Sequence, residues 1–137
     1  MARILTKTMR VLTASIATAG FVLVSGGAQA AAAAKGDAKN GMTVFMDNCA
    51  VCHTAEKGAA NKIGPNLFGV VGRKSATAPA FMYSPAMMKA ALTWDAPTLQ
   101  TFLAGPQKKV PGTKMGFPGF SDPQDEADVL AYLVTLK

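Results

Sequence analysis

The sequence predicts an all-α fold, with helices near both ends and long loops between them. Apolar residues recur at helical spacing over residues 38–48 and again from residue 123 onward. Residues 54–83, by contrast, are rich in glycine, proline, asparagine and lysine, and we expect them to form a loop. No segment reads as a clear strand and no internal repeat is present. Helices are therefore expected to supply the core.

The first helix is expected over residues 38–48, because Asp37 is a good N-cap and a helical apolar pattern follows it. The spacing i, i+3, i+4, i+7 assigns one apolar face to Met42, Phe45, Met46 and Cys49. This helix is expected to lead directly into the turn that contains both cysteines of the chain.

Two shorter helices are expected in the second half of the chain. Ser84 and Pro85 suit an N-cap and a first helical position, and they predict a helix to about Ala91. Asp95 predicts the start of the next helix, which the Gly105-Pro106 pair should end. The inward-facing residues of that helix are expected to be Leu99, Phe102 and Leu103.

The last helix is expected to begin at Asp122 and Pro123, after a second loop over residues 106–121. Asp125 and Glu126 fall in its first turn, where the helix dipole favours negative charge. Two apolar rows predict burial over a wide arc: Ala127, Leu130, Ala131 and Val134 in one, and Val129, Tyr132, Leu133 and Leu136 in the other.

Residues 1–30 have the pattern of a cleavable secretory signal peptide. Three basic residues precede an uncharged stretch over residues 11–24, and Ala28-Gln29-Ala30 fits a cleavage site. Cleavage after Ala30 would leave residues 31–137 as a single water-soluble domain in the periplasm. The apolar stretch is near the short end of the lengths that span a bilayer, so an uncleaved membrane anchor is the alternative.

Removal of residues 1–30 lowers the formal net charge from +6 to +3, because three of the 14 Lys and Arg residues lie there. Such a small positive charge does not point to nucleic acid as a partner. Basic residues gather in the middle of the chain: Lys57, Lys62, Arg73, Lys74, Lys89, Lys108, Lys109 and Lys114. Acidic residues cluster near its end: Asp122, Asp125, Glu126 and Asp128. A basic face opposite an acidic one would steer encounters with a negatively charged partner.

The run Cys49-Ala50-Val51-Cys52-His53 has the spacing of a c-type haem attachment motif. Two thiols on one short turn can each add to a vinyl group of the same porphyrin, and the imidazole that follows can bind the iron. Three alternatives are a structural disulfide, a thioredoxin-like pair, which needs a βαβ unit, and a zinc site, which needs about four ligands. Because the chain has no other Cys or His, one covalent haem c is the interpretation that uses all three residues.

If His53 binds the iron, the sixth position is open to Met, Lys, water or no ligand. Prolines and glycines flank Met115 over residues 111–119, and such a loop can lie against a flat ring and direct one sulfur at the metal. We therefore favour Met115 as a ligand over Met115 as core filler; methionine opposite histidine would raise the reduction potential. The other methionines after residue 30 are weaker candidates: Met42, Met46, Met82, Met87 and Met88.

Further segments accompany the haem motif in order: Gly36-Asp37, Gly41, Phe45, Ile63-Gly64-Pro65-Asn66-Leu67, Gly72-Arg73-Lys74, Ala78-Pro79-Ala80-Phe81-Met82-Tyr83, Leu92-Thr93-Trp94, Pro111-Gly112-Thr113-Lys114-Met115 and Ala127-Asp128-Val129-Leu130-Ala131-Tyr132-Leu133. With these segments, residues 36–137 resemble the class I cytochromes c, most closely the mitochondrial-type and short bacterial c2-type group. The resemblance implies the class I cytochrome c fold, in which crossed N- and C-terminal helices, short helices and long loops surround one covalent haem. Gly41, Phe45 and Tyr132 would lie at the crossing.

The resemblance also implies roles for residues around the haem. His53 and Met115 would be the axial ligands of the iron, and Cys49 and Cys52 would hold the haem covalently. The carbonyl of Pro65 would accept the Nδ1 proton of His53 and so orient its ring. The other implied haem contacts are Trp94 and Tyr83 at the propionates, Arg73 and Thr113 near them, and Phe117 at the exposed edge.

Three positions depart from the family pattern. Phe102 stands where the family often has a tyrosine that donates toward the methionine sulfur, and Met87 stands where it often has asparagine. Both changes would make the methionine side of the haem drier. Gln107 replaces a common lysine, so the basic ring would be thinner than in many members.

The implied function is that of a one-electron carrier, not an enzyme. A peroxidase or gas-binding haem protein would need an accessible sixth position and usually a distal acid–base group, for which no second histidine exists. The candidate docking residues are Lys62, Lys108, Lys109 and Lys114. The expected partners are a quinol–cytochrome c reductase and a cytochrome c oxidase, with a photosynthetic reaction centre or a periplasmic dehydrogenase as alternatives. The protein is expected to be a monomer.

Overall fold

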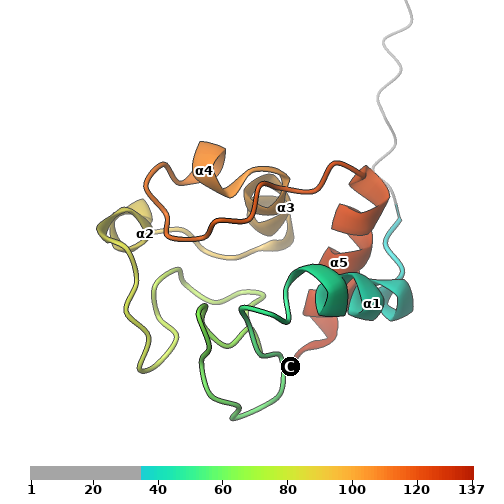
Figure 1. Cartoon of the computed structure of the whole chain (residues 1–137), viewed down its shortest axis with the longest axis horizontal. Helices are drawn as coiled ribbons and strands as arrows, with labels where there is room; N and C mark the ends of the chain where they lie inside the picture. Colours follow the sequence, from blue (N-terminus) through green and yellow to red (C-terminus); the bar gives the residue numbers. More distant parts are fainter. Residues whose placement is uncertain (1–34) are drawn as a thin grey trace, which may run out of the picture. The chain divides into compact units, whose positions relative to one another are not determined.

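Five helices and the long loops between them make up the described part of the chain. The computed structural model describes residues 35–137, so the predictions for the leader and for residues 31–34 lie outside the described residues. The helices are α1 (Ala38–Asn48), α2 (Pro85–Ala90), α3 (Ala96–Ala104), α4 (Pro106–Lys109) and α5 (Pro123–Thr135). In Figure 1, α1 and α5 lie together on the right, and the loop from α1 to α2 fills the lower part.

The predicted all-α fold is confirmed over residues 35–137. Regular β-structure in this part of the chain is limited to one isolated antiparallel bridge between Lys74 and Thr93. The same residues contain no helix with the length and apolar character needed to cross a bilayer. Helices and loops together supply the core, because the buried Val70, Trp94 and Val110 lie outside the helices.

Side-chain caps start four of the helices at the predicted positions. The capping residues are Asp37, Ser84, Asp95 and Asp122, and each side chain accepts a hydrogen bond from a backbone N–H in the first turn of its helix. Proline occupies one of the first two positions in α2, α3 and α5, where its missing N–H costs nothing. Local residue types thus fixed where these helices begin.

The single-turn helix α4 was not predicted, because residues 106–121 were expected to form a loop throughout. Gly105 ends α3 and precedes α4, while Pro106 opens α4. The Gly-Pro pair therefore ends one helix and begins another, since proline is tolerated at a first helical position. Val110, which follows α4, is only 3 % exposed and anchors this corner to the core.

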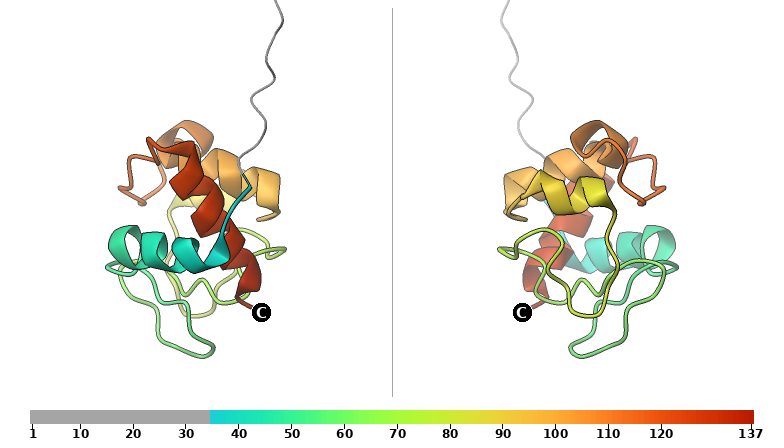
Figure 2. Two further views of the ribbon diagram at one scale, coloured as in Figure 1. Left: turned by 90° about the vertical axis from the view of Figure 1, so that its right-hand side faces the viewer. Right: turned by 90° about the vertical axis from the view of Figure 1, so that its left-hand side faces the viewer.

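The apolar face predicted for α1 is only partly confirmed: Phe45 is buried and Cys49 is half-buried, but the two methionines are exposed. Met42 and Met46 are 51 % and 62 % exposed, whereas Gly41, Val44 and Phe45 are buried. The reason is the close crossing of α1 and α5, visible in the left view of Figure 2. A Cβ at Gly41 would overlap the carbonyl oxygen of Asp128, so α5 can approach only on this side of α1.

Aromatic packing fills the crossing next to Gly41. The rings of Phe45 and Tyr132 have centroids 5.4 Å apart, and a Cβ at Gly41 would lie 3.0 Å from the Cβ of Tyr132. The three residues expected at the crossing therefore lie there.

Only two of the four acidic residues near the end of the chain, Asp122 and Asp125, are available to an acidic face. Glu126 is 8 % exposed and Asp128 is 2 % exposed. Asp128 accepts hydrogen bonds from Asn40 Nδ2 at 2.6 Å, from the backbone N–H of Asp37 at 2.7 Å and from Gln124 Nε2 at 2.8 Å. These bonds, that from Asn40 foremost, lower the pKa of the Asp128 carboxyl. Burial raises the pKa of Glu126, partly offset by a hydrogen bond from Gln100.

The core lies between α3, α5 and the loops. Leu99, Phe102 and Leu103 are buried on α3 as predicted, and Val129 and Leu133 are buried on α5. Of the two apolar rows predicted on α5, only part is buried: Val134, for example, is 37 % exposed. α5 therefore buries a narrower arc than expected.

Candidate functional site

A cavity of about 390 Å³ lies between the cysteine-containing turn and the Met115 loop. Its volume is within the range of typical ligand sites, about 300–1,000 Å³. All of the predicted site residues line it: Cys49, Cys52, His53, Pro65, Arg73, Tyr83, Trp94, Thr113, Met115 and Phe117. Residues from widely separated parts of the sequence therefore meet around one space.

The turn that follows α1 brings both thiols and the imidazole to the cavity. The backbone N–H groups of Cys52 and His53 donate to the carbonyl of Cys49 at 3.0 and 2.9 Å, which closes the turn. The two cysteines are free thiols in the structure. Burial raises the pKa of the Cys49 thiol to about 11, and the neighbouring Cys52 adds to the effect. The Cys49 sulfur is therefore a neutral thiol at pH 7.

His53 is held by the loop that crosses beneath it. Its Nδ1 atom lies 2.7 Å from the carbonyl oxygen of Pro65. A carbonyl can only accept, so Nδ1 carries the proton and the Nε2 lone pair is left available. Burial lowers the pKa of His53, the bond to Pro65 opposes this, and the charge of Lys62 adds to the lowering. A neutral imidazole with a free lone pair is the form that binds a metal.

Gly64 makes room for the imidazole of His53. A Cβ at position 64 would overlap the ring carbon Cε1 and would lie 2.7 Å from both ring nitrogens. The same segment is tied to the turn by a bond from Gly64 N to the Cys52 carbonyl at 2.8 Å and from Lys62 Nζ to the Ala50 carbonyl at 2.6 Å. Only glycine lets this loop lie flat against the ring.

The loop carrying Met115 also lines the cavity. Met115 is half-buried, and its backbone N–H donates to the hydroxyl of the buried Thr113 at 3.3 Å. Phe117, two residues further on, packs edge-on against Phe120 with centroids 4.9 Å apart. This loop thus presents a thioether and an aromatic ring to the same cavity.

The polar residues expected at the propionates lie at the cavity, but their hydrogen bonds go partly to the protein. The guanidinium of Arg73 donates to the carbonyls of Asn66 at 3.0 Å and Phe68 at 3.2 Å. The hydroxyl of Tyr83 accepts from the backbone N–H of Ala78 at 3.2 Å. Because Tyr83 accepts there, its own hydroxyl proton is available to another acceptor.

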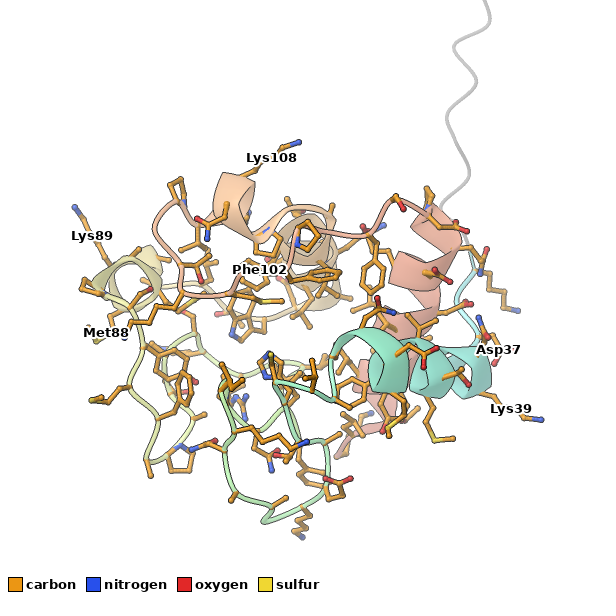
Figure 3. All side chains as sticks on the ribbon, in the orientation of Figure 1. Asp37, Lys39, Met88, Lys89, Phe102 and Lys108 are labelled. Atoms are coloured by element: carbon orange, nitrogen blue, oxygen red, sulfur yellow. The ribbon has the colours of Figure 1, made fainter. Side chains whose placement is uncertain are left out.

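Several lining residues were not predicted as site residues. They are chiefly apolar: Ile63, Gly64, Leu67, Val70, Leu99, Phe102, Leu103 and Met87 among them. Figure 3 places Phe102 in the interior, whereas Lys89 and Lys108 point outward from the ribbon. The ring of Phe102 packs against Trp94 with centroids 4.9 Å apart. Phe102 and Met87 stood out in the sequence as departures from the family pattern. Gly64 was not predicted as a site residue, although its place next to Pro65, the expected partner of His53, was a signal for a close approach to the imidazole.

Comparison with known proteins assigns the family. A family model described as cytochrome c matches residues 38–137. The chain belongs to the cytochrome c family. Cytochrome c of Sesamum indicum is 49 % identical over 98 residues, which are 72 % of this chain and 88 % of that protein. Cytochrome c2 of Rhodopila globiformis is 50 % identical over 102 residues, which are 74 % of this chain and 95 % of that protein.

A solved structure of the same family has the same fold. Cytochrome cH from Methylobacterium extorquens is 50 % identical and superposes with a TM-score of 0.67, covering 73 % of this chain and 99 % of that one. The chain is accordingly a class I cytochrome c, an electron carrier that binds one covalent haem c. The residues present fit that group, because two free thiols, a neutral imidazole and a largely apolar cavity meet where Gly64 leaves space for the imidazole.

Proposed function

We propose that this cytochrome c is a periplasmic one-electron carrier whose haem iron is bound by His53 and Met115. The observation that supports the proposal most strongly is the state of His53. Its Nδ1 is bonded to Pro65 at 2.7 Å, and the cavity that it lines is also lined by Met115. His53 and Met115 therefore both border the same space.

The haem supplies the one-electron couple of its iron. The protein contributes fixed ligands, exclusion of water and control of the ring of His53. Pro65 holds the imidazole in one tautomer, which increases its basicity as a ligand. The buried Phe102 and Met87 line the cavity and keep its methionine side apolar. A thioether ligand in a dry site favours the reduced state and so a raised potential.

Polar residues at the cavity would bind the propionates. Trp94 and Tyr83 each carry a donor, and the buried Thr113 lies on the same cavity. Arg73 would act chiefly through its charge, since its terminal nitrogens already donate to two backbone carbonyls. Phe117 would flank the edge of the haem, and Cys49 and Cys52 would hold the ring through thioether bonds.

A lysine-bearing surface near the cavity would dock acidic redox partners transiently. Lys108, Lys109 and Lys114 are exposed, and Lys114 also lines the cavity. Lys62 contributes its charge while bonded to the Ala50 carbonyl. The proposed partners are a quinol–cytochrome c reductase and a cytochrome c oxidase, or else a reaction centre or a periplasmic dehydrogenase.

The proposal includes export of the chain by a signal peptide over residues 1–30. Residues 1–30 would direct export and be removed after Ala30, leaving residues 31–137 as one monomeric domain. The intact mass of the exported protein tests this directly. A mass that retains residues 1–30 would favour the anchored alternative.

Spectroscopy of the haem-loaded protein tests the ligation. Ferric protein should show a sulfur-to-iron charge-transfer band, and Met115→Ala should abolish it and lower the potential. Met82→Ala is the matched control, because Met82 is 84 % exposed and should leave the band intact. A missing band in the unaltered protein, or rapid carbon monoxide binding by its ferrous form, would contradict Met115 as ligand.

Salt dependence tests the docking surface. Electrostatic steering predicts that the rate of electron transfer to an acidic partner falls roughly tenfold or more as salt rises from low to high concentration. Replacing Lys108, Lys109 and Lys114 by Gln should reduce that dependence, whereas Lys39→Gln, at an exposed position of α1, should not. Rates that do not change with salt would refute docking through these lysines.

A further inference from the structure

The side chain of Gln107 joins α4 to the loop that carries Met115. Its Nε2 atom donates to the carbonyl oxygens of Thr113 at 2.8 Å and of Met115 at 3.3 Å. Its Oε1 atom accepts from the backbone N–H of Gly112 at 3.3 Å. One carboxamide therefore satisfies three backbone groups of the Met115 loop, defined here as residues 111–116.

The Met115 loop has few other attachments to the core. Residues 110–113 form a turn, closed by a bond from Thr113 N to the Val110 carbonyl at 3.0 Å, in which Gly112 has a φ of 87°. Proline followed by a left-handed glycine is typical of a type II turn. Within the loop only Thr113 is buried, and Met115 is half-buried. Segments with so little buried surface open at low free energy, so individual hydrogen bonds matter there.

The other end of the connection is firm. Gln107 belongs to α4, whose first residue, Pro106, is buried, as is Val110, which follows the helix. The backbone of α4 is closed by bonds from Lys109 N to Gly105 at 3.0 Å and from Val110 N to Pro106 at 2.8 Å. The carboxamide thus links a weakly held loop to a fixed corner of the core.

Glutamine is suited to this position by its chemistry. A primary amide offers both donor hydrogens and an acceptor oxygen, and all three bonds use them. A lysine at the same position could donate but not accept, and an ionised glutamate could accept but not donate. The bonds are therefore specific to an amide, and they predict a graded effect of substitution.

We infer that Gln107 is a positioning residue that holds the Met115 loop closed and so limits how often the sixth position of the iron becomes accessible. The inference rests on the proposed function, because it takes Met115 as the ligand. Loss of these three hydrogen bonds, called here the Gln107 brace, leaves the cavity and its lining residues unchanged, but the Met115 loop opens more often. An added ligand then enters sooner.

The test measures the rate at which imidazole, added at saturating concentration, displaces the methionine from the haem-loaded ferric protein. Gln107→Ala should raise this rate about tenfold, because it removes one short and two long hydrogen bonds. Gln107→Lys and Gln107→Glu should give smaller increases, since each keeps part of the set. Lys89→Ala is the matched control, because it removes an exposed side chain from α2 and should leave the rate unchanged.

A Gln107→Ala rate equal to that of the unaltered protein would overturn the inference. So would an equal acceleration in Lys89→Ala, which would indicate general loosening of the fold. If Gln107→Ala fails to retain haem, the Lys and Glu variants decide the matter in the same assay.

Hydrogen exchange separates this inference from the proposed ligation. The amide of Gly112 donates directly to Gln107, so its exchange should accelerate in Gln107→Ala whatever binds the iron. If the Gly112 amide exchanges faster in Gln107→Ala but the unaltered protein shows no charge-transfer band, Met115 is not the ligand, and the Gln107 brace is still supported. If the unaltered protein shows the band, but Gln107→Ala changes neither the exchange of the Gly112 amide nor the rate of imidazole binding, Met115 is the ligand and the Gln107 brace is rejected.

Discussion

The crossing of α1 and α5 predicts that Gly41→Ala destabilises the protein. A Cβ at position 41 would lie 2.5 Å from the carbonyl carbon of Asp128, whereas ordinary van der Waals contact begins at 3.4 Å. The nearest atoms belong to the backbone of α5, so no change of rotamer relieves the overlap. The two helices would have to separate locally by roughly 1 Å, which forfeits about a quarter to a half of the attraction at each contact across the interface.

The size of the effect follows from two opposing contributions. Overpacking of a close interface costs about 1–3 kcal/mol. Replacing glycine by alanine inside a helix contributes about 1 kcal/mol in the other direction. Because the overlap is with backbone, we expect a cost near the upper end, and so a net loss of about 2 kcal/mol in the free energy of unfolding.

Denaturant unfolding of the haem-loaded protein, followed by circular dichroism, measures this loss. Met42→Ala, one residue along the same helix, is the matched control, because Met42 is 51 % exposed. It should change the free energy of unfolding by no more than about 0.5 kcal/mol. A Gly41→Ala protein as stable as the unaltered one, or more stable, would refute the reasoning, because helix propensity alone predicts that result.

Two further predictions concern stability. Hydrogen bonds from Asn40 and from the N–H of Asp37 lower the pKa of Asp128 in the folded protein. The ionised carboxylate therefore contributes to the free energy of unfolding. This contribution is fully present above the pKa of aspartate in the unfolded chain, about 4, and is lost as the pH falls through the lower pKa of the folded state. Urea midpoints measured between about pH 2 and about pH 5 should therefore rise with pH, and Asp128→Asn should flatten the slope; an equally steep slope in the variant would contradict this. Ala91 has a φ of 49°, where glycine is less strained, so Ala91→Gly should raise the free energy of unfolding by about 0.5–1 kcal/mol. A lower urea midpoint for Ala91→Gly would show that strain is not stored there.

The helices could be predicted from sequence because their signals are local. Asp37, Ser84 and Asp95 each cap a helix within three residues, and the inward face of α3 follows from spacing alone. The haem motif is equally local, since five consecutive residues carry it. The other cavity residues could be predicted only from the family resemblance. The resemblance carries information about contacts between distant segments, which the spacing of residues within one segment does not.

What the sequence did not indicate depends on contacts between distant segments. The face of α1 is decided by how close α5 comes at Gly41, and a periodic pattern gives Met42 the same weight as Val44. The burial of Asp128 depends on Asn40, which lies 88 residues away. The amide of Gln107 matters only because the turn before Met115 directs three backbone groups toward it. None of these partners can be recognised from residue type.

The α1–α5 crossing also has a consequence for the life of the nascent polypeptide. The ribosome releases α1, with Cys49 and Cys52 at its end, long before α5, because Asp37 and its partner Asp128 are 91 residues apart. Until α5 docks, the turn after α1 is held by its own backbone bonds and by those from Gly64 and Lys62, while the buried face of α1 has no partner. The topology thus makes the α1–α5 crossing one of the last long-range contacts that can form as the chain is synthesised, so α1 cannot reach its native packing until nearly the whole domain has been made.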